Sequence, residues 1–290
     1  MAPIVDLLAA GPTFSFEFFP PKNDDEQAAL VRTLRQLEPL EPSFVSVTYR
    51  GGRSSRDRTL GLVSGMLKTT SLNPMAHLIC VAHTRLELAE ILLELRKSGV
   101  HNLMALGGDP PTDPEAGPGE LAFAIELVEL ARAIGGFSIG VAAHPIGHPR
   151  SPDLASDRRY LAEKLQRGDF AITQFFFEAQ DYLRLIDDME PTGVTKPIIP
   201  GIMPIRSLKS VPRMAQMGAA VPSWMVAKLE AAGSPEAEAR VGIECATELC
   251  EKLLAEGAPG LHFYTLNTST ATREIYRSLG LGPGRAEDAG

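Results

Sequence analysis

Cysteine is scarce in this sequence of 290 residues, which contains only Cys80, Cys245 and Cys250. Each of the three lies in an apolar segment, and none belongs to a CxxC pair. The sequence therefore offers neither a disulfide framework nor a zinc knuckle, and we expect the protein to work in a reducing compartment.

Long apolar runs are also missing. No stretch reaches the roughly 18 apolar residues that a membrane-spanning helix requires. Residues 1–12 lack the basic segment and following apolar stretch that mark a secretory signal. We therefore expect a cytoplasmic protein with no membrane partner.

Positive charge is in deficit. The chain carries 28 Lys and Arg against 36 Asp and Glu, which gives a formal net charge of -8. Such a balance provides no basic surface for a phosphate backbone, so we expect no nucleic-acid partner.

The composition is that of a soluble globular enzyme, with 44% hydrophobic and 22% charged residues. No linker, low-complexity segment or repeat divides the chain. We therefore expect a single catalytic domain over residues 1–290, in which the glycine-rich residues 282–290 form a frayed tail.

Short β-branched or aromatic runs alternate with longer amphipathic stretches along the chain. This alternation is typical of parallel βα units. The runs are mostly apolar, as expected for strands covered by helices on one face and by a barrel interior on the other. The eight predicted strands are 14–18, 44–49, 76–81, 102–106, 138–143, 171–176, 197–202 and 261–266; predicted helices include 24–37, 84–98, 119–134, 154–167 and 236–256.

Eight βα units in about 290 residues predict an α/β fold, the (β/α)8 TIM barrel. Residues 206–217 and 222–232 predict extra helices between the seventh and eighth strands. The alternative is a doubly wound open sheet, which would need a glycine fingerprint after the first strand. That strand is instead followed by the residues FPPK at 19–22, which cannot form a GxGxxG turn.

Glu17 is the strongest candidate for a catalytic residue, because four phenylalanines lie within the six residues 14–19 that surround it. An apolar environment disfavours an ionised carboxylate and favours a protonated one, which suits a general acid. The alternative is a structural carboxylate bonded to a neighbouring strand.

Three further polar residues stand near the carboxyl ends of predicted strands, where a barrel has its active site. Thr48 ends the second strand and could equally pack or cap. Asp109 follows the fourth strand in a Gly-Asp-Pro turn, a sequence that is also common without a function. Gln174 places an amide in an apolar strand, where a heterocyclic ligand or a neighbouring backbone group could satisfy it.

His144 and His148 follow the fifth strand and suggest a metal site, but a proline comes after each and disfavours the helix that would align them. No third ligand stands at a recognisable spacing, so we expect no metal. Met214 belongs to a methionine group that suits a core or the wall of a pocket for a flat ligand. Serine hydrolase chemistry is disfavoured because no GxSxG motif occurs.

Six segments, in order and at family spacing between about residues 13 and 283, closely resemble the methylenetetrahydrofolate reductase family. They are FSFEFFPPK at 14–22, FVSVTY at 44–49, GD at 108–109, AITQFFF at 171–177, IIPGI at 198–202 and HFYTLN at 262–267. The resemblance implies a TIM barrel that reduces 5,10-methylenetetrahydrofolate to 5-methyltetrahydrofolate with a hydride from NADH or NADPH, in one-carbon and methionine metabolism.

The resemblance also implies roles for individual residues. Glu17 matches the family's acidic catalyst, which helps to open the bridged methylene group to an iminium cation. Asp109 matches a carboxylate near the pterin, and Gln174 matches an amide that contacts the pterin; Met214 is a further candidate for substrate binding. Thr48 and His77 match positions beside the flavin or nicotinamide.

The sequence departs from the family's flavin-binding pattern. Gly107 stands where flavin-binding members carry Arg, Tyr160 and Glu163 replace an Asn and an Arg, and His144 replaces a tyrosine; Asp157 and Lys164 are kept as candidate cofactor contacts. These changes remove cations that a dinucleotide diphosphate needs. We therefore hypothesise that FAD is absent and that NADH or NADPH reduces the folate directly.

Three alternatives remain open at this point. The first is the same reaction through bound FAD. The second is a metal-dependent barrel hydrolase or lyase that uses His144, His148 and Asp109. The third is a silent folate-binding relative. The resemblance also allows a homo-oligomer.

Overall fold

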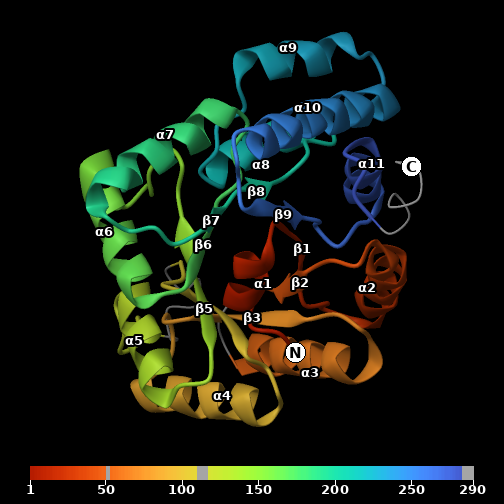
Figure 1. Ribbon diagram of the computed structural model, residues 1–290. Coiled ribbons are helices and arrows are strands. Elements are labelled where there is room, and N and C mark those ends of the chain that lie inside the picture. Colours follow the sequence, from red (N-terminus) through yellow and green to blue (C-terminus); the bar gives the residue numbers. More distant parts are fainter. Residues whose placement is uncertain (50–52, 110–116, 283–290) are drawn as a thin grey trace.

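The computed structural model describes residues 1–49, 53–109 and 117–282, with the backbone alone at 53–57. Parallel strands form one sheet in the order β7-β6-β5-β4-β3-β2-β1-β9-β8, surrounded by helices (Figure 1). The strands are β1 (Thr13–Phe18), β2 (Phe44–Val47), β3 (Pro74–Ile79), β4 (Asn102–Leu106), β5 (Ser138–Ala143), β6 (Phe170–Thr173), β7 (Ile198–Ile199), β8 (Gly201–Ile202) and β9 (Gly260–Tyr264).

The strands β7 and β8 together occupy one position of a nearly closed barrel. Pro200, which has no backbone N–H, separates them, and the Pro200 carbonyl accepts a hydrogen bond from the His262 N–H at 2.9 Å. β7 pairs with β6 on one side, and β8 pairs with β9 on the other. The nine short strands therefore fill eight positions, and the predicted (β/α)8 barrel is confirmed.

The outer helices follow the predicted alternation. The Asn23 side chain accepts a hydrogen bond from the Glu26 N–H and so begins α2, and Thr84 forms a capping box with Glu87 at the start of α4. The long helices are α2 (Asp24–Leu37), α3 (Arg53–Thr69), α4 (Arg85–Lys97), α5 (Ala124–Ile134), α6 (Leu154–Arg167), α7 (Ala179–Met189), α10 (Pro235–Ala255) and α11 (Thr270–Ser278).

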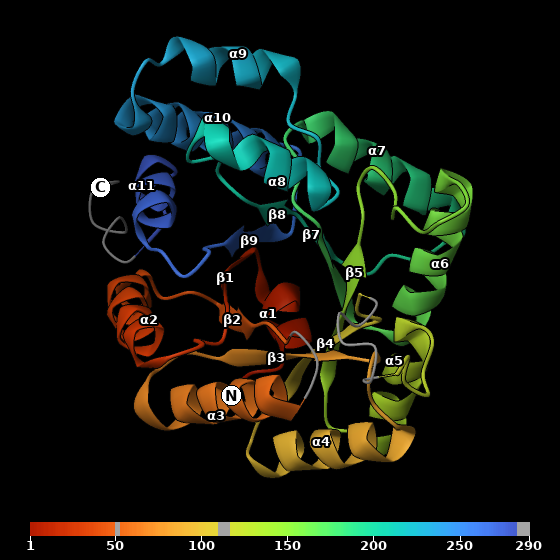
Figure 2. The ribbon, with the colours of Figure 1, turned by 180° about the vertical axis from the view of Figure 1, so that it is seen from behind.

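The extra length before the last strand is helical, as predicted. α8 (Val211–Gln216) and α9 (Ser223–Ala231) precede α10, and α9 packs outside α10 at the rim of the barrel (Figure 1 and Figure 2). Of the tail predicted at 282–290, residues 283–290 lie outside the described part of the chain. No helix in the described ranges is long and apolar enough to cross a bilayer.

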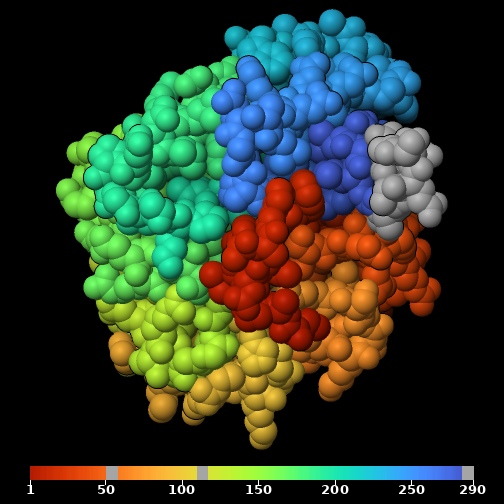
Figure 3. Space-filling model, in the orientation of Figure 1, coloured from red at the N-terminus to blue at the C-terminus, as the bar shows by residue number. Residues whose placement is uncertain are grey.

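A short helix that the sequence analysis did not anticipate, α1 (Ile4–Ala10), covers the amino end of the barrel (Figure 3). The Ile4 N–H donates to Asn102 Oδ1 at 2.9 Å, and the Val5 N–H donates to Ser138 Oγ at 3.1 Å. Ile4 is fully buried among the side chains that fill the lower barrel, which are Phe44, Met75, Met104, Phe170, Ile172 and Ile199. The amino end of the barrel is therefore closed by an apolar plug.

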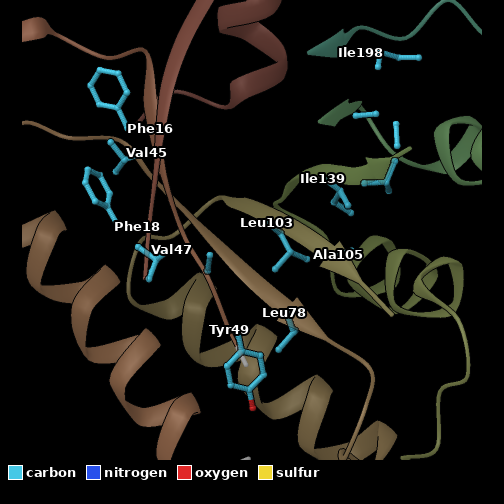
Figure 4. Packing of buried hydrophobic residues seen from close by; sticks show 14 of the residues in the cluster. Phe16, Phe18, Val45, Val47, Tyr49, Leu78, Leu103, Ala105, Ile139 and Ile198 are labelled. Carbon is cyan, nitrogen blue, oxygen red and sulfur yellow. The ribbon is translucent and has the colours of Figure 1, made fainter. Parts of the chain in front are cut away.

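The main core lies between the strands and the outer helices. Phe16 and Phe18 on β1 and Val45 and Val47 on β2 are fully buried and lie side by side (Figure 4). The neighbours of Phe16 on β1, Ser15 and Glu17, belong to the opposite face because side chains alternate along a strand. The alternation therefore directs apolar side chains of β1 toward the outer helices, where they form the core, and directs polar side chains into the barrel interior.

Candidate active site

The Glu17 carboxyl group lies between two imidazole rings near the carboxyl ends of the strands. Its Oε2 atom is 3.5 Å from His77 Nε2 on β3 and 3.7 Å from His262 Nε2 on β9, and the residue is only 6% exposed. The predicted burial of this carboxyl group is therefore found, and it is accompanied by two titratable neighbours from other strands.

His77 is neutral at neutral pH. Burial lowers its pKa to about 4, although the Glu17 charge opposes the shift; His262 adds to it. In the described part of the chain His77 Nε2 has no hydrogen-bond partner, although it faces Glu17. A neutral imidazole therefore lies beside the Glu17 carboxyl group.

Tyr264 borders the same carboxyl group. It shares the inner face of β9 with His262, because side chains alternate along a strand and the residue between them, Phe263, is buried in the outer core. Burial, together with the Glu17 charge, raises the pKa of Tyr264 well above its ordinary value. The Tyr264 hydroxyl donates to the Thr173 carbonyl at 2.7 Å. Tyr264 is therefore a neutral wall of the site rather than a source of charge.

The segment after β9 holds the end of β1 in place. Asn267 Oδ1 accepts from the Phe19 N–H at 2.8 Å, and Asn267 Nδ2 donates to the Phe19 carbonyl at 2.9 Å. The Thr265 hydroxyl donates to the Glu17 carbonyl at 2.6 Å. The HFYTLN segment therefore fixes the backbone that carries Glu17.

His262 is the site residue to which the sequence analysis gave no role. Its Nδ1 atom is 2.7 Å from Ser15 Oγ, and its Nε2 atom is 3.4 Å from Ser46 Oγ. The signal that could have identified it is the recurrence of polar residues at inward positions of neighbouring strands, namely Ser15 and Glu17, then Ser46, then His262.

Thr48 follows β2 and is 8% exposed. Its carbonyl accepts from the Thr59 hydroxyl at 3.0 Å, whereas its own Oγ1 atom is buried and has no hydrogen-bond partner in the described ranges. Thr48 Oγ1 is therefore free to bond to a ligand.

Asp109 is exposed on the loop after β4, and its charge acts on the pKa of His148. Gly108, with φ +87°, lets this loop pack closely, since an added Cβ would lie 3.2 Å from side-chain atoms of Ile79 and Val81. A cation from another loop also reaches this turn.

That cation is Arg150, whose Nη2 atom donates to the Gly108 carbonyl at 3.1 Å. Gly108 directly follows Gly107, the position at which the resemblance implies an arginine in flavin-binding members. Arg150 therefore brings a guanidinium group next to the turn from which the expected arginine is missing.

His144 and His148 lie edge to face, with ring centroids 4.6 Å apart. Burial lowers the pKa of His144 to about 4, and it also lowers the pKa of His148. Across the described residues, no group of three His, Cys, Asp or Glu side chains could hold a metal ion. The pair is a neutral aromatic surface at the mouth of the barrel.

Asp157 bonds to the loop that carries these histidines, and Lys164 bonds to the end of β5 just before it. Asp157 Oδ1 accepts from the His148 N–H and the Ser151 hydroxyl, each at 3.1 Å, and Asp157 Oδ2 pairs with Arg158. Lys164 Nζ donates to the Ala142 carbonyl at 2.6 Å, and burial lowers its pKa to about 8. Both side chains already have protein partners.

Gln174 follows β6 and is partly exposed. Its Nε2 atom donates to the Met217 carbonyl at 3.4 Å, and its Oε1 atom accepts from the Phe175 N–H at 3.0 Å. Met214 is buried in an apolar cluster with Phe175 and Met203. Gln174 is thus accessible to a ligand, whereas Met214 is buried.

The family model of methylenetetrahydrofolate reductase matches residues 4–280. A 5,10-methylenetetrahydrofolate reductase of Pectobacterium carotovorum is 37% identical over 93% of this chain and 90% of the relative. The Salmonella typhimurium protein of the same name is 38% identical over 93% of this chain and 91% of the relative. An Arabidopsis thaliana protein named methylenetetrahydrofolate reductase (NADH) 1 is 36% identical over 92% of this chain and 48% of its own length.

A solved structure from Clostridium thermocellum, described as a protein that binds two copies of 5-methyl-5,6,7,8-tetrahydrofolic acid, shares the fold. Its TM-score is 0.65 at 13% identity, and the match covers 95% of this chain and 97% of that chain. The family expected from the sequence motifs is confirmed by the family match and the bacterial relatives. This chain belongs to the methylenetetrahydrofolate reductase family.

Proposed function

We propose that this protein reduces 5,10-methylenetetrahydrofolate to 5-methyltetrahydrofolate, with NADH as the hydride donor. The observation that carries the proposal is the buried Glu17 carboxyl group, flanked by His77 and His262 at the carboxyl ends of the strands. The name of the Arabidopsis relative supports NADH as the coenzyme.

The reaction needs a proton and a hydride. Glu17 donates a proton to the amine nitrogen that leaves the bridging carbon, and the C–N bond opens to an iminium cation. The hydride then adds to the methylene carbon and gives the methyl group. The neighbouring His77 is neutral, because burial lowers its pKa to about 4.

Three residues at the mouth have roles in binding. Asp109 supplies a carboxylate that stabilises the developing cation when the folate binds beside this exposed residue. Gln174 exchanges its weak 3.4 Å bond to the Met217 carbonyl for a bond to the pterin. Thr48 offers its hydroxyl, which has no partner among the described residues, to the substrate or the nicotinamide.

The residues at the expected flavin positions do not fit a tightly held FAD. Lys164 is engaged with a protein group, since it bonds to the Ala142 carbonyl, and Asp157 is paired with its neighbour Arg158. The acidic residue at position 163 adds a negative charge on α6. Arg150, which bonds to the Gly108 carbonyl, supplies a cation near the loop after β4. An exposed cation of this kind suits a phosphate-containing coenzyme that binds and dissociates in each turnover.

We therefore propose direct hydride transfer from NADH to the folate. The test is an ultraviolet–visible spectrum of the purified protein, followed by NADH oxidation with 5,10-methylenetetrahydrofolate, with and without added FAD. The proposal predicts no flavin absorbance near 450 nm and turnover that FAD does not increase. Stoichiometric flavin that NADH bleaches would support the FAD route, and no folate-dependent oxidation would refute the reductase function.

A further inference from the structure

Three polar side chains lie inside the barrel around Glu17, on three neighbouring strands. Ser15 on β1 and Ser46 on β2 are 0% exposed, and His262 on β9 is 1% exposed. The layer beneath them is apolar, with Ile4 from the plug helix α1. An unpaired donor at this depth costs free energy, so most buried donors are paired with an acceptor.

Counting donors assigns the proton on His262. If the Ser46 hydroxyl donates to Nε2 at 3.4 Å, then Nδ1–H donates to Ser15 Oγ at 2.7 Å, and the Ser15 hydroxyl donates to the Leu261 carbonyl at 3.4 Å. Every donor then has an acceptor. The other tautomer would leave the Ser46 hydroxyl without an acceptor among the described contacts.

We infer that Ser15 and Ser46 fix His262 with its proton on Nδ1, so that Nε2 faces Glu17 as an acceptor rather than as an N–H and favours the protonated carboxyl group. Nε2 has one lone pair, so a proton donor on Glu17 shares it with the Ser46 hydroxyl, whose 3.4 Å contact is long for a hydrogen bond. His262 is therefore a positioning residue that favours the protonated form of Glu17, the proton donor, between turnovers. This inference rests on the proposed reductase function for its catalytic meaning.

The other groups around the carboxyl group are consistent with this assignment. Facing Glu17 are neutral His77 from β3 and Tyr264 from β9, whose hydroxyl is bonded to the Thr173 carbonyl. The Phe44 ring stacks on the His262 ring with the centroids 5.9 Å apart and the planes at 16°, which holds the plane of the imidazole. The 3.7 Å separation between Nε2 and the carboxyl Oε2 shortens when the carboxyl group is protonated and donates.

The first test reads the tautomer directly. The six histidines are labelled with 15N, and two-bond correlation spectra at pH 7.5 distinguish the tautomers. The His262 signal is identified by its loss in His262→Gln and by its shift in Ser15→Ala. A proton on Nδ1 is expected; a proton on Nε2, or an imidazolium, would overturn the inference whether or not the protein is a reductase.

The second test measures how the pH dependence of kcat changes when the hydrogen bond between Ser15 and His262 is removed. Ser15→Ala removes the acceptor of Nδ1–H, so the proton moves to Nε2 and favours ionised Glu17. The alkaline limb of the pH–kcat profile is expected to move down by about one pH unit. The control is Thr13→Val on the same strand, which removes a buried hydroxyl that has no hydrogen-bond partner in the described chain.

The outcomes separate the two proposals. Wild-type turnover with a shifted Ser15→Ala profile and an unshifted Thr13→Val profile supports both. Wild-type turnover with identical profiles in the two variants overturns the inference alone. Absence of wild-type turnover overturns the reductase function and, with it, the catalytic role of His262.

Discussion

Glu17 is the residue on which the chemistry depends. Replacing it by Gln keeps the size and the burial but removes the transferable proton, so kcat is expected to fall by about 10²–10⁴. Binding of 5-methyltetrahydrofolate, measured by equilibrium dialysis, should change little. The control is Glu90→Gln on the exposed face of α4, and a Glu17→Gln enzyme with near-normal kcat would contradict the proposal.

The buried histidines make stability depend on pH. Burial lowers the pKa of His77 to about 4 from a model-peptide value of 6.5. The unfolded chain therefore binds this proton first, so the free energy of unfolding is constant above about pH 6.5 and falls as the pH drops toward 4. The loss is expected to be on the order of 2 kcal/mol by pH 5.

Urea unfolding at several pH values tests this expectation. His77→Asn should flatten the pH dependence of the free energy of unfolding, whatever its effect at pH 7.5. His101→Asn is the control, because His101 lies near the surface of the loop before β4. Equal slopes for the two variants would show that His77 does not contribute.

At the scale of elements, Gly242 determines how α10 packs on the barrel. A Cβ atom at this position would overlap the Ile205 carbonyl oxygen, which is backbone and cannot move aside cheaply. Gly242→Ala is therefore expected to lower the free energy of unfolding by about 2 kcal/mol or more. The matched control is Gly61→Ala in α3, where no atom lies within 4 Å and a gain of about 0.5–1 kcal/mol is expected. Equal effects in chemical denaturation would contradict this account.

The plug helix α1 makes a second prediction at this scale. Ile4→Ala leaves a cavity in the closed end of the barrel and is expected to cost about 2–4 kcal/mol of unfolding free energy. Leu86→Ala on α4, where the side chain is 69% exposed, is the control and should change it by less than about 0.5 kcal/mol. Similar melting temperatures for both variants would show that α1 is not part of the core.

For the whole molecule, the alternation of strands and helices predicted the barrel because local periodicity reports burial. Strand ends were less accurate: the second strand was expected to reach residue 49 but ends at Val47, and the seventh is broken at Pro200. The pairing of Ser15 with His262 spans 247 positions in the sequence. Such a contact depends on barrel closure, so local patterns could not predict it, whereas the isolated charge of Glu17 could be recognised.

Transfer of deuterium from NADH labelled at the reactive C4 position tests the central claim most directly. Direct hydride transfer predicts that the label appears in the methyl group of 5-methyltetrahydrofolate without loss to water. Loss of the label to solvent, as expected when a reduced flavin exchanges its hydrogen, would contradict direct transfer from NADH to the folate.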